Sequence, residues 1–226
     1  NIEIGKLITA GSANGIALSM ESDIHVLSEL NLQNNTRKID LNNHILTLSE
    51  IENNGVLTGG GASNYIISQT GASQFIRYAT TAAPTTYLFP LGDATGYTPI
   101  SVTMNNGASV GSNTRLQSSM TTNAHPNLGS SSNYISRYWT VEPLNLTGIP
   151  SYGVEYIYKD ADVTGVEAQL KPYKYGTNSG WIAAIGSGAS YEQGTGVVNP
   201  GTNTITWTGL SSFSDFTGNG NGTPLP

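Results

Sequence analysis

The chain has 226 residues, a length that suits one large β domain or two smaller ones. It contains no Cys, which excludes a disulfide framework, a thiolate metal site and a cysteine nucleophile. Only 11% of its residues are charged, against roughly 25% in an average globular domain, and its formal net charge is −6. This composition provides no basic surface for nucleic acid or anionic lipid, and no apolar run is long enough to span a membrane.

The first third of the chain repeats a short doublet, in which two apolar residues flank one other residue. The doublets are Ile2/Ile4, Ile16/Leu18, Ile24/Val26, Leu30/Leu32, Ile39/Leu41 and Leu46/Leu48. Asn-rich segments such as Asn34-Asn35 and Asn42-Asn43 separate them, and Asn suits tight corners because it tolerates the left-handed conformation. Short strands joined by such corners predict a β-solenoid-like region over residues 1–75. A meander of antiparallel hairpins with the same spacing is the alternative.

Beyond residue 75 the expected strands are longer and richer in aromatic residues. They cover residues 97–104, 134–141, 152–158, 170–175, 181–185 and 204–207. Their spacing, with Gly, Asn and Ser between them, favours an immunoglobulin-like β-sandwich over residues 76–216. A short helical turn is expected near residues 163–169, and residues 217–226 are expected to form a linker or tail. The predicted fold class is therefore all-β, with a short N-terminal solenoid-like region followed by a sandwich.

Several segments of residues 40–226, taken in order, resemble one group of exported proteins. The clearest are Phe89-Pro90-Leu91-Gly92-Asp93, Ser136-Arg137-Tyr138-Trp139-Thr140-Val141, Tyr158-Lys159-Asp160-Ala161-Asp162 and Ser212-Phe213-Ser214-Asp215-Phe216. Their order and spacing are similar to secreted and cell-surface β proteins of Bacteroidetes that the type IX secretion system exports. The resemblance implies an extracellular or cell-surface location, in the region that precedes a C-terminal sorting domain. Such proteins mostly look like adhesins, matrix proteins or accessory modules, and the resemblance supplies no catalytic residue and no defined ligand.

Residues that could carry chemistry are few. The segment from Asp160 through Asp162 to Gly165 resembles the start of a calcium loop, but Lys171 stands where an EF-hand needs a bidentate Glu. A looser calcium site at Asp160 and Asp162 therefore competes with a plain polar turn. The three His residues are far apart in the sequence and are expected at the surface. We expect no catalytic residue and no cofactor, with this calcium as the one alternative.

The aromatic residues of the expected sandwich allow two interpretations. An exposed row drawn from Tyr134, Tyr138 and Trp139, or from the pairs Tyr156/Tyr158 and Tyr173/Tyr175, would form a platform for stacking a surface glycan. Alternatively, these rings fill the core and cover cross-strand neighbours. We expect Trp139 and Phe213 to be buried core anchors.

These observations predict a secreted, non-enzymatic structural or adhesive protein, a self-assembling subunit of an extracellular fibre or matrix. Self-association is expected through Ile2, Ile4, Leu7 and Ile8, because an apolar strand edge with little charge is poorly protected. Leu225 is expected to anchor the tail on a neighbour by strand addition. A head-to-tail contact does not close and yields filaments. The alternative is a monomer whose N-terminal strand is covered by its own sandwich or by a preceding domain. The alternative function is a carbohydrate-binding module of a larger secreted protein.

Overall fold

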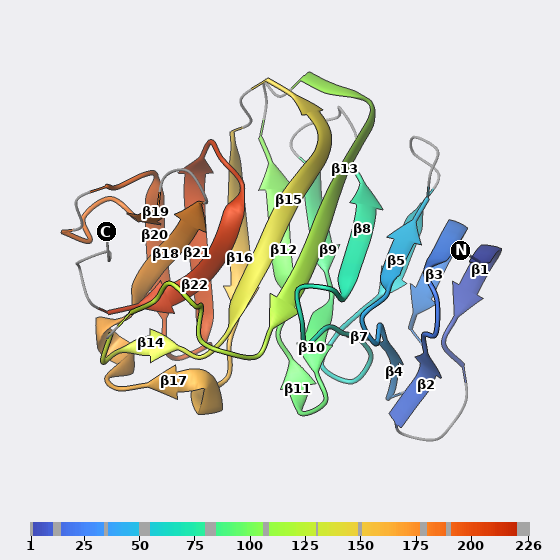
Figure 1. Ribbon diagram of the computed structural model, residues 1–226, viewed down its shortest axis with the longest axis horizontal. Helices are drawn as coiled ribbons and strands as arrows, with labels where there is room; N and C mark the ends of the chain where they lie inside the picture. The colour runs from blue at the N-terminus through green and yellow to red at the C-terminus, as the bar shows by residue number, and fades with distance from the viewer. Residues whose placement is uncertain are drawn as a thin grey trace.

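The protein is built almost entirely from β-strands (Figure 1). The structure, a computed structural model, describes residues 2–10, 15–33, 36–49, 55–79, 85–105, 109–129, 131–148, 151–176, 180–188 and 191–220. These ranges contain twenty-two strands and two short 3-10 helices, Asp160–Asp162 (η1) and Glu167–Gln169 (η2). The all-β prediction is confirmed. In the same ranges, no helix has both the length and the apolar character needed to cross a membrane.

The first part of the chain forms a solenoid-like stack, in which the chain passes back and forth between two parallel sheets. The first parallel sheet contains β1 (Ile2–Ile8), β3 (Ile24–Leu32), β5 (Ile45–Leu48) and β8 (Gln74–Tyr78), with β6 (Val56–Gly59) beside the second half of β3. The second contains β2 (Gly15–Ser19), β4 (Arg37–Asp40), β7 (Ile66–Ile67) and β10 (Leu91–Asp93). Parallel pairing confirms the solenoid and rules out the meander of hairpins, which would pair its strands antiparallel.

Each predicted doublet contributes to a ladder of equivalent positions on successive coils. In the first sheet Ile24, Leu46 and Phe75 stand side by side in register, and all three are buried. Ile39 and Ile66 form the corresponding ladder in the second sheet. This stacking removes apolar side chains from water on every coil, which is the main force that holds such a stack together.

The corners of the solenoid agree in part with the sequence prediction. Asn42 and Asn43 have φ angles of 45° and 65°, the left-handed conformation expected of Asn at a tight corner. Asn34 and Asn35 lie outside the described residues. The expected corner between the doublets of Val26 and Leu30 does not form, because both doublets belong to the nine-residue strand β3.

The sandwich grows directly from the solenoid, because β8 belongs to both. One edge of β8 pairs with β5 in parallel, and the other edge pairs with β13 antiparallel. From there the sheet continues through β13 (Ser109–Thr121), β15 (Tyr138–Thr147), β22 (Ser214–Asn219), β18 (Lys171–Gly176) and β19 (Gly180–Ala183). The short strand β14 (Tyr134–Ile135) pairs with the end of β22 at Asn219, on the same edge as β15, and β17 (Val163–Thr164) pairs with β14. One twelve-stranded sheet therefore runs through both regions, and the expected boundary at residue 75 falls inside β8.

A second, antiparallel sheet covers the inner face of the first. It contains β9 (Thr85–Phe89), β12 (Ile100–Met104), β16 (Tyr152–Ile157), β21 (Thr204–Leu210) and β20 (Thr195–Asn199). The short strand β11 (Gly96–Tyr97) forms a hairpin with β10. The rings of Trp139 on β15 and Tyr156 on β16 meet across the two layers with centroids 4.8 Å apart.

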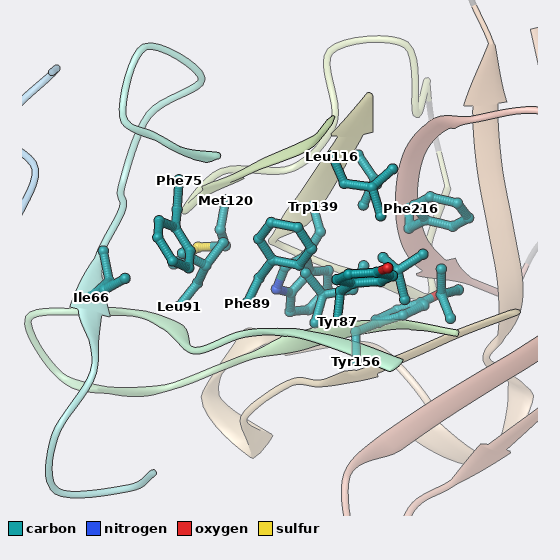
Figure 2. Packing of buried hydrophobic residues seen from close by; sticks show 14 of the residues in the cluster. Ile66, Phe75, Tyr87, Phe89, Leu91, Leu116, Met120, Trp139, Tyr156 and Phe216 are labelled. Carbon is teal, nitrogen blue, oxygen red and sulfur yellow. The ribbon is translucent and has the colours of Figure 1, made fainter. Parts of the chain in front are cut away.

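The larger of two hydrophobic clusters among the described residues extends through both regions, and the smaller one contains Leu128, Tyr173, Trp181 and Ala183. Figure 2 shows part of the larger cluster, from Ile66 of β7 to Phe216 of β22, with Phe89 and Trp139 between them. Trp139 is fully buried, as predicted. Phe213 is only partly buried and stacks on Tyr152 at the margin of the core, so Phe216 is the buried aromatic anchor of this segment instead.

The tail was predicted to begin at residue 217, but the last strand continues to Asn219. Residues Thr217 to Asn219 complete β22 and are buried. Among them, Gly218 packs where a larger residue would not fit. A Cβ on Gly218 would stand 2.5 Å from Cδ1 of Ile135. The Gly-rich composition that suggested a linker is therefore partly a packing requirement. Residues 221–226, including Leu225, lie outside the described residues.

Candidate functional site

A cluster of charged side chains lies buried where the solenoid meets the sandwich. Its centre is Arg137, which follows β14 and has a side chain only 1% exposed to solvent. The guanidinium group donates from Nε to Oδ2 of Asp162 at 2.9 Å and from Nη2 to Oδ1 of the same residue at 3.0 Å. Nη2 also donates to Oδ2 of Asp93 at 2.5 Å. Two carboxylates therefore share one guanidinium, and the bidentate contact with Asp162 fixes its plane.

Asp93 receives further hydrogen bonds from the turn that it begins at the end of β10. Its Oδ1 accepts from the backbone N–H groups of Thr95 and Gly96, at 2.6 and 2.9 Å, and Nζ of Lys159 donates to Oδ2 at 2.6 Å. Burial alone would raise the pKa of Asp93, but the hydrogen bonds from Lys159, Thr95 and Arg137 outweigh it and hold the pKa well below its usual range. Asp93 is therefore ionised at neutral pH and fully paired.

Arg137 also connects the cluster to the core. Its Nη1 donates to the hydroxyl of Thr98 at 3.2 Å, and the indole N–H of Trp139 donates to the carbonyl of Thr98 at 2.9 Å. Burial would lower the pKa of Arg137, but its hydrogen bonds to Asp162 and Asp93 raise it above the ordinary value. The cluster thus joins three segments distant in sequence, residues 93–98, 137–139 and 159–162, and leaves its central guanidinium surrounded by protein partners, an arrangement suited to fixing the fold.

Sequence reasoning did not predict this cluster. Asp93, Arg137 and Asp162 all fall in segments quoted for the resemblance, yet no local pattern indicates that they meet. A signal was present in the composition: with only nine Lys and Arg residues in the chain, an Arg directly before a strand containing Trp139 is unusual enough to suggest a buried partner.

The two carboxylates of the calcium prediction have different partners. Both oxygens of Asp162 accept from Arg137, whereas Oδ1 of Asp160 accepts from the side-chain amide of Asn203 at 2.5 Å. Asp162 also accepts from the backbone N–H of Lys159 at 3.0 Å, which closes the turn of η1. Across the described ranges, no group of three or more His, Cys, Asp or Glu side chains is arranged to hold a metal ion.

One histidine departs from its expected surface position. His125 is buried, with Nε2 3.0 Å from Oδ2 of Asp215 and with the backbone N–H of Asn127 donating to Nδ1 at 3.2 Å. Because Nδ1 accepts a hydrogen bond, the imidazole carries its proton on Nε2 and donates it to Asp215. His44 lies half-buried, with Nδ1 3.6 Å from Oδ1 of Asp23.

His125 belongs to an aromatic cluster on the outer face of the long sheet. Its ring centroid lies 4.8 Å from those of Tyr138 and Tyr175 and 4.9 Å from that of Trp181. Trp181 is itself covered, since its indole N–H donates to the carbonyl of Asn127 at 2.7 Å. The loop that carries His125 and Asn127 therefore folds over one part of this face and holds the Tyr138 ring in place.

The predicted aromatic platform is reduced by the fold to a few rings. Tyr156, Tyr158 and Tyr173 are buried, so they belong to the core interpretation. Tyr138 and Tyr175 remain half-buried on the outer face of the sheet. Tyr175 belongs to a row of paired residues that crosses five strands and changes from polar to aromatic, and Tyr138 lies beside this row. The row consists of Ser119, Thr140, Asp215, Tyr175 and Trp181.

The polar end of this row is hollowed. A cavity of about 250 Å³ opens there, over β8, β13, β15 and β22. Its lining consists of Gly71, Gln74, Gln117, Ser119, Tyr138, Thr140, Glu142 and Asp215. The hydroxyl of Thr140 donates to Oδ1 of Asp215 at 2.5 Å, and the amide of Gln117 donates to Oε2 of Glu142. Sequence reasoning missed this hollow, because its residues come from four strands separated by long stretches of chain.

The predicted self-association residues lie on β1, at the open end of the solenoid (Figure 1). Ile2 and Ile8 are 51% and 44% exposed, whereas Ile4 and Leu7 are partly buried against the core. β1 pairs with β3 on one edge and β2 pairs with β4 on one edge, and within the described chain no strand pairs with the other edge of either. The end strands of both parallel sheets thus lie at the same end of the molecule.

Comparisons with known proteins add nothing to this geometry. No family model, curated protein or solved structure matches the chain. The function must therefore be argued from the open end of the solenoid, the buried ion cluster and the hollow on the outer sheet.

Proposed function

We propose that this protein is a secreted, non-enzymatic structural or adhesive protein of the cell surface that associates with copies of itself through the open end of its solenoid. The observation that carries the proposal is the double edge at that end. Two parallel sheets each finish on a strand with one edge unpaired among the described residues, and exposed isoleucines lie on both strands.

The physical reason is the poor protection of these edges. A free strand edge presents unpaired N–H and C=O groups and is usually guarded by charge, proline or a bulge. β1 has one register irregularity between Ile4 and Lys6, and Lys6 forms its ion pair with Glu29 of β3 within the same sheet. On β2, Ile16 is 50% exposed. A second solenoid end would pair both edges and bury these side chains at once.

The non-enzymatic part of the proposal is supported by what the charged residues do. The buried charges that would first attract attention as catalytic groups, Asp93, Arg137 and Asp162, satisfy one another and connect segments of the fold. The secreted, surface location is supported by the Cys-free, charge-poor composition and by the resemblance to exported surface proteins of Bacteroidetes.

Light scattering of the purified chain over a wide concentration range tests the proposal. We expect the mass to rise with concentration, and we expect the double variant Ile2→Lys/Ile8→Lys to remain monomeric because it places charge on the edge. Ile185→Lys is the matched control, since Ile185 is 62% exposed but lies between β19 and β20. Its mass should follow that of the unaltered chain.

Two results would overturn the proposal. One is an unaltered chain that stays monomeric at the highest concentration, and the other is a double variant that associates as strongly as the control. Electron microscopy of the associated form then separates two geometries: a contact that pairs like with like closes as a dimer, whereas a head-to-tail contact gives filaments.

A further inference from the structure

We propose that the hollow on the outer face of the long sheet, lined by Tyr138, Thr140, Glu142 and Asp215, binds one neutral sugar ring of a glycan. This inference rests on the adhesive part of the proposed function and gives it a site and a class of ligand. It uses a surface distinct from the solenoid end, because the hollow lies over β8, β13, β15 and β22.

The floor and walls of the hollow are set by strand register. Ser119, Thr140 and Asp215 are direct neighbours on three adjacent strands. Gln117 and Glu142 form the next pair on the same face of β13 and β15, two residues further along each strand. Ser119 is only 3% exposed although it belongs to the outer face, so it forms a floor below its neighbours. Rigid strands hold binding groups more accurately than loops do.

The polar groups in the lining are of the kind that sugar hydroxyls require. Gln74 and Gln117 contribute planar amides, and Glu142 and Asp215 contribute planar carboxylates, each of which can engage two neighbouring hydroxyls. Asp215 is held in position, because one oxygen accepts from Thr140 and the other from His125. A carboxylate has about four acceptor positions, so Asp215 retains capacity for a ligand after these two bonds.

Tyr138 provides the apolar surface at one side of the hollow. Its ring packs against the buried imidazole of His125 with centroids 4.8 Å apart, which limits its rotation before any ligand arrives. A sugar ring has an apolar face of C–H groups, and an aromatic ring is the usual protein partner for a surface that is apolar on one side and polar at its edge. A fixed ring loses little conformational freedom on binding.

Size and charge restrict the ligand further. A volume of about 250 Å³ is below the range of roughly 300–1,000 Å³ for drug-sized ligands, which favours a single ring over several. As far as the described residues go, the lining contains two carboxylates and no Lys, Arg or His. Acidic sugars would therefore meet like charge without compensation, and neutral hexoses are the class that fits.

Affinity gel electrophoresis with soluble polysaccharides tests this site. The neutral probes are xyloglucan, galactomannan and laminarin, and alginate is the acidic comparator. We expect at least one neutral probe to retard the protein and alginate not to do so. Tyr138→Ala and Glu142→Gln should each weaken the retardation by about tenfold or more, since they remove the stacking ring and a carboxylate acceptor.

Two control variants match these substitutions in type. Tyr191→Ala removes a ring that is 67% exposed elsewhere, and Glu21→Gln neutralises an exposed carboxylate in the solenoid region. Both should bind like the unaltered chain, and thermal melting of all four variants checks that each is folded. Glu142→Gln keeps the shape of the side chain, so its loss of binding with an unchanged melting temperature assigns the effect to the hollow.

The inference is overturned if no neutral probe retards the protein, or if the two hollow variants bind as well as their controls. Retardation by alginate in place of the neutral probes would also overturn it. The self-association proposal is tested separately: Ile2→Lys/Ile8→Lys should keep its sugar binding, and failure of sugar binding leaves the light-scattering result unaffected.

Discussion

The solenoid and sandwich regions share one sheet and one core, but different interactions organise them. In the solenoid, Ile24, Leu46 and Phe75 repeat the same apolar position on successive parallel strands. Its ion pair between Lys6 and Glu29 lies at the surface. In the sandwich, large rings such as Trp139 meet across two sheets, and a buried cluster around Arg137 joins distant segments.

This difference explains why the two regions expose different surfaces. Each solenoid coil uses its neighbours for pairing, and the coil with β1 and β2 has an edge that no strand of the described residues pairs. The sandwich buries the charged cluster around Arg137 and covers part of its outer face with the loop of His125. The open end of one region therefore suits self-association, while the hollowed face of the other suits a ligand.

The largest expected effect comes from breaking the buried cluster. Arg137→Met should lower the free energy of unfolding by about 3–5 kcal/mol, because it leaves Asp93 and Asp162 without their buried partner. Urea unfolding measures this loss. Glu29→Gln removes the exposed solenoid pair instead and should leave the unfolding midpoint almost unchanged. Equal losses of unfolding free energy in the two variants would show that the buried charges of the sandwich stabilise the fold no more than the exposed ion pair of the solenoid does.

Substitution of buried aromatic residues in the sandwich should lower the free energy of unfolding by nearly as much as loss of the ion cluster. Trp139→Ala and Phe216→Ala each remove a fully buried ring and should cost about 3–5 kcal/mol in unfolding free energy. Phe213→Ala should cost clearly less, because Phe213 is only partly buried and stacks on Tyr152 at the margin of the core. A loss for Phe213→Ala as large as that for Phe216→Ala would contradict this description of the core.

A solenoid substitution tests whether the two regions unfold together. Leu46→Ala removes a fully buried rung of the ladder and should cost about 2–5 kcal/mol. Because β8 and the core are continuous with the sandwich, we expect one cooperative transition that shifts as a whole. Fluorescence from the Trp residues, all of which belong to the sandwich, and circular dichroism should report the same midpoint. Separate midpoints would indicate two independently unfolding units.

The smallest expected effect concerns a buried amine in the sandwich. Lys174 on β18 donates from Nζ to neutral oxygens of Gln193 and Ser212, and burial lowers its pKa to about 8. The unfolded chain holds this proton up to the ordinary pKa of Lys, about 10.4. Between these two pKa values the unfolded chain binds more protons than the folded chain, so stability should rise as the pH increases from about 8 toward 9.5 and should level off at its lower value below about 8. Urea midpoints of Lys174→Met should lack this rise, and its persistence in that variant would contradict the assignment.

The predictability of the molecule from its sequence follows the same division. The solenoid was predictable because its signal is local: a doublet and an Asn corner recur within a few residues. The ion cluster was not, because Asp93 and Arg137 are separated by 44 residues and Arg137 and Asp162 by 25. Composition shows that charges are scarce but not which ones meet. The hollow depends on the register of four strands, and Gly218 shows how a packing glycine can resemble a linker residue.

Hydrogen–deuterium exchange at low and high protein concentration tests the central claim, that the open solenoid end is the surface of self-association. In β1, alternate N–H groups point away from β3, and pairing with a second copy would protect them. We expect exchange in β1 and β2 to slow as the concentration rises, with no such change in β20, an edge strand of the sandwich. Exchange in β1 and β2 that does not depend on concentration, or protection that appears in β20 instead, would contradict the account.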